Sequence, residues 1–103
     1  MDIAWIIDRV RAQHYRWSRH ADRERQNDRL TLAEVEQALL AGRVLESYPD
    51  TGRGESCLLA GFADNGKPIH AVCGRQGDWL VIVTVYIPTP PKFITPFERG
   101  NKS

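Results

Sequence analysis

The sequence lacks the features that mark membrane, disulfide-rich and metal-binding proteins. No apolar run approaches the roughly 18 to 20 residues of a membrane helix, and the first residues show no basic segment followed by an apolar core. Only two cysteines occur, and no histidine or cysteine recurs at the spacing of a metal site. We therefore expect a cytoplasmic protein with no membrane contact, no metal and no other cofactor.

What is present suits one small domain. The 103 residues are 42% hydrophobic and 26% charged, which fits a single modest core. Four prolines between Pro88 and Pro96 exclude a helix or a central strand at the end of the chain. We predict an α+β domain over residues 1–87 and an extended, proline-rich tail over 88–103. Phe93, Ile94 or Phe97 would anchor that tail.

Helical patterns fill the first part of the chain. Apolar residues at helical spacing predict a helix over residues 3–13, with Asp2 as its cap. After a short extended segment at 15–17, Ser18 can start a second helix that runs to Asp28. Thr31 begins a third helix with a capping box, and Gly42 sits where a left-handed residue would end it.

Strand patterns follow from residue 43. We predict strands over 43–48, 56–62, 68–73 and 79–86, with a hairpin at Asp64-Asn65-Gly66 and a turn over 74–78. Short connections predict a four-stranded antiparallel sheet with the helices packed on one face. A three-residue hairpin loop would place Cys57 opposite Cys73, whereas a two-residue loop would shift the register by one.

Strand alternation assigns side chains to the two faces of this sheet. Val81, Val83 and Val85 would face the helices. Leu80, Ile82, Thr84 and Tyr86 would face the other way, together with His70 from the preceding strand. His70, Thr84 and Tyr86 are therefore predicted to share a face that no helix covers.

Positive charge is concentrated early in the chain. Residues 9–29 contain seven arginines and three acidic residues, although the net charge of the whole chain is only +1. A local basic stripe is what a polyanion such as RNA needs. The alternative is a solvated helix held by internal ion pairs.

These residues suggest cleavage of RNA without a metal. His20 and His70 would exchange protons with the 2′-hydroxyl and the leaving 5′-oxygen, since imidazole changes charge near neutral pH. Arg25 and Arg29 would hold the phosphate. Each of these residues could instead have only a structural role. A histidine can cap a helix or form a hydrogen bond within a sheet, and an arginine can pair with a neighbouring carboxylate.

Several ordered motifs resemble a small bacterial family of unknown function and, more distantly, RelE-like toxin ribonucleases. The similarity covers roughly residues 15–93. Its motifs are Ser18-Arg19-His20-Ala21, Arg25 and Arg29 before Leu30-Thr31, Glu46-Ser47-Tyr48-Pro49, Ser56-Cys57-Leu58, Gly66-Lys67-Pro68-Ile69-His70 and Thr84-Val85-Tyr86-Ile87-Pro88.

The resemblance implies helices on an antiparallel sheet and metal-independent RNA cleavage. His20, His70, Thr84 and Tyr86 would be catalytic. The substrate would be RNA, either free or bound to the ribosome, and the partner would be an antitoxin protein. The chain departs from the family pattern by one extra residue between His20 and Arg25, which would turn the histidine by about 100° against that arginine.

Two other functions fit the same sequence. A binding module without catalysis would use the basic face for nucleic acid or an acidic protein, and its affinity would fall steeply with salt. An interaction domain would form a homodimer through a sheet edge or the proline-rich tail.

Overall fold

The structure is a computed structural model that describes residues 1–50, 52, 54–89, 93–95 and 98–99. It confirms the α+β class. The strand order in the main sheet is β1-β5-β4-β3-β2. The elements are α1 (Ile3–Arg11), β1 (Tyr15–Trp17), α2 (Arg19–Asn27), α3 (Leu32–Leu40), β2 (Arg43–Tyr48), β3 (Ser56–Phe62), β4 (Pro68–Gln76), β5 (Trp79–Tyr86), β6 (Phe93–Thr95) and β7 (Glu98–Arg99).

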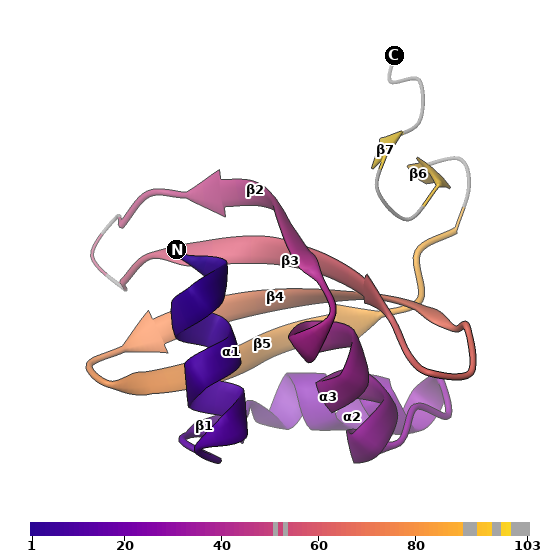
Figure 1. Ribbon diagram of the computed structural model, residues 1–103, viewed down its shortest axis with the longest axis horizontal. Helices are drawn as coiled ribbons and strands as arrows, with labels where there is room; N and C mark the ends of the chain where they lie inside the picture. The colour runs from indigo at the N-terminus through magenta and orange to yellow at the C-terminus, as the bar shows by residue number, and fades with distance from the viewer. Residues whose placement is uncertain (51, 53, 90–92, 96–97, 100–103) are drawn as a thin grey trace.

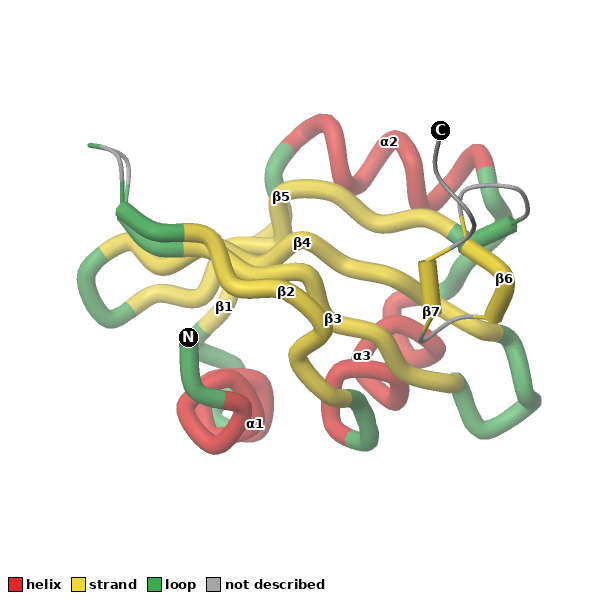
Figure 2. Tube along the Cα trace, turned by 90° about the horizontal axis from the view of Figure 1, so that it is seen from above, coloured by secondary structure: helices red, strands yellow, loops and turns green. Residues whose placement is uncertain are grey.

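The helices take two different positions on the sheet. Figures 1 and 2 show α1 and α3 on one face, whereas α2 runs beside β5. The core lies between the sheet and the helices, and its fully buried side chains include Ile6 of α1, Leu39 of α3 and Ile82 of β5. Within the described part of the chain, no helix is long and apolar enough to cross a membrane.

The helix caps are those that the sequence predicted. Asp2 accepts a hydrogen bond from the backbone of Ala4, and Thr31 and Glu34 form the reciprocal capping box. The Thr31 amide, with help from Lys67 and Asn65, lowers the pKa of Glu34 from its ordinary 4.5 to about 2.

The prediction for Gly42 is wrong, because this residue is not among those with positive φ. Its role is steric. A Cβ atom at Gly42 would lie 2.6 Å from the carbonyl oxygen of Ala38, and one at Gly61 of β3 would lie 2.1 Å from the same oxygen. The two glycines allow the end of α3 to approach β3 more closely than any side chain would permit.

The prediction of four antiparallel strands is wrong in one respect. The short segment Tyr15–Trp17 is a fifth strand, and it pairs in parallel with Leu80–Ile82 of β5. The sheet is therefore mixed. Local connections could not reveal this pair, because its strands are far apart in the sequence and no hairpin joins them.

The central hairpin takes the first of the two registers that the sequence left open. Ala63 donates its backbone N–H to Lys67, Gly66 has a φ of 90°, and the three-residue loop places Cys57 opposite Cys73. Both thiols are fully buried and unbridged. Strand β4 continues to Gln76, so the predicted turn over 74–78 is shorter than expected.

A bulge in β5 overturns the predicted assignment of its faces. Cys73 pairs with Ile82, but Val72 pairs with Thr84, so Val83 is an extra residue without a partner on β4. Leu80 and Ile82 consequently face the core, while Val83 is 40% exposed. Beyond the bulge the alternation reverses and the prediction holds. Val85 is buried in the core, and Thr84 lies on the opposite face.

The tail contains more backbone pairing than the sequence predicted. β6 and β7 form a two-stranded antiparallel ladder separate from the main sheet. Residues 90–92, 96–97 and 100–103 lie outside the described part, and so does the predicted anchor Phe97. The side chains of the other two predicted anchors, Phe93 and Ile94, also lie outside it, so docking of the tail stays a prediction.

Candidate functional site

The polar helix α2 covers the outer edge of β5. The Glu24 carboxylate accepts the backbone N–H of Val85 at 3.1 Å, and the Asp28 carboxylate accepts that of Ile87 at 3.2 Å. Four residues of helix rise about 6 Å and two residues of strand about 6.6 Å, so the two repeats stay in step. Strand β1 ends at Trp17, and α2 satisfies the edge that β1 leaves open.

His20 stands one turn before Glu24 on the same side of α2. The bulge interrupts the two-residue repeat of β5 at this level, so the N-cap contact sets the alignment here. The Ser18 hydroxyl donates to the Val83 carbonyl at 2.9 Å. The N-terminal end of α2 and the β5 bulge thus lie side by side.

A carboxylate orients the His20 imidazole. Its Nε2 lies 3.3 Å from Oε2 of Glu24, whose other oxygen holds the Val85 amide. The His20 side chain is 66% exposed and that of Glu24 only 29%. By its distance the contact is an ion pair, which forms when the imidazole carries a proton. The arrangement is an exposed imidazole beside a carboxylate that the sheet edge holds in place.

The predicted phosphate-binding residues lie elsewhere. The Arg25 guanidinium pairs with Asp22 at 2.8 Å, donates to the carbonyl of Leu30, and lies over the Trp17 ring. These contacts assign it to packing between α2 and the following loop. Arg29 lies beyond the end of α2, at a positive φ of 57°. The structure therefore places neither arginine beside His20.

The predicted residues of the sheet share one face. His70 and Tyr86 are cross-strand partners, with Nδ1 of the imidazole 3.2 Å from the phenol oxygen. Thr84 is half-buried two residues before Tyr86. His70, however, is fully buried. Strand β5 lies between its strand and α2, so the structure does not join His70 and His20 in one exposed site.

A cleft opens on this helix-free face where the bulge exposes Val83. Its volume is about 270 Å³, and its apolar walls are Val72, Val81 and Val83. Gly74, the cross-strand partner of Val81, also lines it, and a Cβ atom there would lie 3.4 Å from the Val83 side chain. Thr84 pairs with Val72, so it borders the inner end of the cleft.

An aromatic and cationic group stands at the other end of the cleft. The His14 and Trp79 rings stack at 4.0 Å with 20° between their planes. The Arg16 guanidinium lies 5.5 Å from the centre of the Trp79 ring and donates to the Gln76 side chain at 2.8 Å. Gln76 itself lines the cleft.

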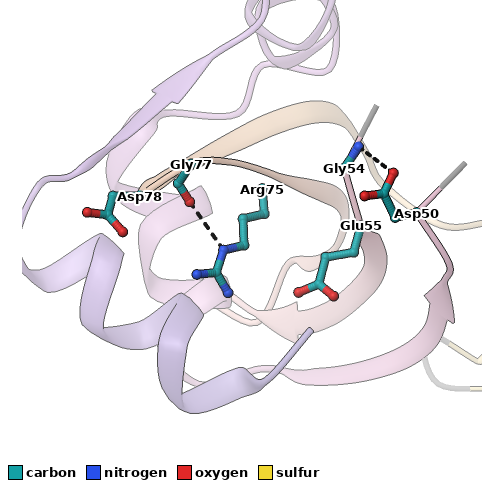
Figure 3. A pocket seen from close by; sticks show the side chains of 6 residues that line it. All are labelled: Asp50, Gly54, Glu55, Arg75, Gly77 and Asp78. Atoms are coloured by element: carbon teal, nitrogen blue, oxygen red, sulfur yellow. Dashed lines mark hydrogen bonds between the residues drawn. The ribbon is translucent and has the colours of Figure 1, made fainter. Parts of the chain in front are cut away.

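A larger hollow, of about 700 Å³, lies at the end of the sheet near the loop after β2. Figure 3 shows Arg75 between Glu55 and Asp78, with Asp50 at the far side. The backbone amides of Gly52 and Gly54 hold the Asp50 carboxylate and lower its pKa. Three carboxylates around one arginine would repel a phosphate, so we do not assign the RNA to this hollow.

Metal ligands do not gather in the described residues. No three of their His, Cys, Asp and Glu side chains lie close enough together to hold an ion. The Glu24 carboxylate, four residues after His20, binds the Val85 amide at the β5 edge.

The comparison with protein families assigns the chain. A family model described as a domain of unknown function, DUF4258, matches residues 17–87. The chain belongs to the DUF4258 family. The DUF4258 match begins at the end of β1 and includes α2, α3 and strands β2 to β5, hence His20, Glu24 and the bulge. The comparisons with curated proteins and with solved structures gave no match.

Sequence reasoning missed three parts of this DUF4258 site. It gave Glu24 no role, although the i, i+4 spacing from His20 is that of a pair on one side of a helix. It placed Val83 in the core, and no sequence signal marks the bulge. It did not connect Arg16 with Trp79, because that contact depends on the parallel pairing of β1 with β5.

Proposed function

We propose that this DUF4258 protein is a metal-independent ribonuclease whose proton acceptor is His20. The observation that carries the proposal is the chain of contacts from the exposed His20 imidazole through Glu24 to the Val85 amide. An exposed imidazole whose protonated form a neighbouring carboxylate stabilises suits general base catalysis. The distant similarity to RelE-like ribonucleases agrees with this chemistry but is an analogy of fold.

The reaction needs no protein nucleophile. His20 Nδ1 removes the proton from a ribose 2′-hydroxyl, and the 2′-oxygen attacks the adjacent phosphorus. A 2′-O–P bond forms and the P–O5′ bond breaks, while water protonates the departing 5′-oxygen. The products are a 2′,3′-cyclic phosphate and a 5′-hydroxyl. Glu24 stabilises the imidazolium that forms, as a carboxylate does in other histidine dyads.

Nearby arginines supply the positive charge for the phosphate. Arg19 and Arg23 are exposed on α2, immediately before His20 and one turn after it, and neither forms an ion pair with a described residue. Arg16 stands just before the helix. Under this proposal these three replace Arg25 and Arg29 as phosphate ligands.

The remaining predicted residues take supporting roles in the proposal. The buried His70 and the half-buried Tyr86 stabilise the sheet, and Thr84 borders the place where the substrate would lie. A cell that makes such a ribonuclease needs a means of restraining it, so we retain an antitoxin protein as the proposed partner.

The test is cleavage of labelled RNA of mixed sequence in EDTA, with and without translating ribosomes. We expect the parent to give fragments that end in cyclic phosphate and His20→Ala to lower the rate at least about 100-fold. Glu24→Gln should lower it at least about tenfold, because a neutral amide cannot stabilise the imidazolium that forms on His20. Arg11→Ala, on an exposed part of α1, is the control and should cleave normally.

Two results would overturn the proposal. One is equal cleavage by the parent and by His20→Ala purified in the same way. The other is intact RNA in every reaction, with ribosomes included, which would favour a binding module without catalysis. His70→Ala separates the roles of the two histidines. We expect it to unfold more easily, while the molecules that remain folded keep the parent rate.

A further inference from the structure

The cleft beside His20 carries an inference that rests on the proposed function and extends it. We propose that the cleft lined by Val72, Gly74, Val81 and Val83 binds one base of a single-stranded RNA next to the phosphate that is cleaved. Arg16 and Trp79 would hold the adjoining nucleotide. The proposal assigns a base-binding subsite to the helix-free face of β4 and β5.

The shape and lining of the cleft suit a flat, mostly apolar ring. Its volume of about 270 Å³ is near the lower limit of ordinary small-molecule sites. The valines offer apolar contact to the faces of a base, and Ser56 and Gln76 offer hydrogen bonds at its rim. Gly74 keeps the space open, because any larger side chain on that strand position would project beside Val83.

Two arginines stand at the rim of the cleft. Arg75 lines it together with Glu55, and Arg16 donates a hydrogen bond to Gln76, which lines it as well. Glu55 offsets the charge of Arg75, so the positive charge that can act on a phosphate is that of Arg16 on β1. The phosphate next to a bound base is therefore attracted toward the β1 side of the cleft.

The Trp79 ring, on which His14 stacks, adds an aromatic and cationic group at the end of the cleft. Trp79 is 38% exposed although it is large and apolar, and Arg16 lies over its ring. Exposed aromatic rings beside arginines are the usual means of holding unpaired bases and their phosphates. A protein strand or peptide would also find backbone partners at a sheet edge, but the edge of β5 is already occupied by β1 and α2. RNA is thus the better occupant.

The experiment measures binding separately from cleavage. The probe is a short, labelled 2′-fluoro RNA of mixed sequence, which has no 2′-hydroxyl to react, and the readout is fluorescence anisotropy. Gly74→Leu fills the cleft, and Gly74→Ala is its matched control, because a lone Cβ atom makes only ordinary contact with Val83. Arg16→Gln tests the cation, with Arg11→Gln as the control of equal charge change.

We expect Gly74→Leu to weaken binding of the probe at least about tenfold, as the loss of one bound base would, and Gly74→Ala to change it little. Arg16→Gln should weaken binding and lower the slope of affinity against salt by about one, and Arg11→Gln should not.

The outcomes separate this inference from the proposed function. Probe binding that Gly74→Leu leaves unchanged, or a parent that does not bind the probe, overturns the base subsite even if His20→Ala abolishes cleavage. If Gly74→Leu and Arg16→Gln weaken binding while no variant or parent cleaves RNA, the subsite is supported and the ribonuclease proposal fails.

Discussion

The contacts between α2 and β5 predict that Glu24 and Asp28 stabilise the folded protein. Glu24→Ala would remove the acceptor of the Val85 amide, and Asp28→Ala that of the Ile87 amide. Both amides lie on the side of β5 where β1 no longer reaches them. Each change therefore leaves a half-buried backbone donor without a protein partner.

The magnitude follows from the type of bond. A hydrogen bond to a charged acceptor contributes about 1.5 to 3 kcal/mol. At Glu24 the higher helix propensity of alanine offsets a few tenths of a kcal/mol of this loss. We expect each variant to lose about 1 to 2.5 kcal/mol of unfolding free energy. For a domain of this size the melting temperature should fall by about 5 to 15 °C.

Urea unfolding followed by circular dichroism measures these losses. Arg23→Ala is the matched control, because Arg23 is exposed on the same helix and should change stability by no more than about 0.5 kcal/mol. Glu24→Gln retains an oxygen within reach of Val85 and should lose less than Glu24→Ala. If Glu24→Ala and Asp28→Ala both unfold at the urea concentration of the parent, α2 does not cap the sheet edge.

Three further predictions concern other parts of the fold. Because the pKa of Glu34 is lowered in the folded state, its ionised carboxylate contributes fully to the free energy of unfolding above pH 4.5, and this contribution disappears as the pH falls through about 2. The difference in unfolding free energy between the parent and Glu34→Gln should therefore narrow over that range. A constant difference in urea unfolding would contradict this. Gly61→Ala should lower the free energy of unfolding by more than about 2 kcal/mol, because its Cβ would overlap a carbonyl oxygen of α3, whereas Gly74→Ala should lower it by less than about 1 kcal/mol. Equal urea midpoints for the two variants would refute the close approach of α3 to β3. Cys57 and Cys73 should react with a thiol reagent only after unfolding, since both are fully buried; fast labelling of the native protein would be the contrary result.

Local sequence was sufficient for most elements of this protein. Capping at Asp2, Ser18 and Thr31 depends on side chains within a few residues of the amides that they bind, so the helix starts could be predicted. The hairpin at Asp64-Asn65-Gly66 could be predicted for the same reason, whereas its loop length, and with it the pairing of Cys57 with Cys73, came from the structure. The shared face of His70, Thr84 and Tyr86 followed from alternation alone.

Tertiary structure decided the candidate site. The pairing of β1 with β5 joins residues far apart in the chain, and the bulge at Val83 changes the alternation without any sequence signal. Together they expose Val83, open the cleft and bring Arg16 to Trp79. The polar character of α2 was evident from the sequence, but only the contact with β5 shows that Glu24 and Asp28 complete a sheet edge. Periodicity describes one element at a time, whereas a site made at the junction of two elements depends on how they pack.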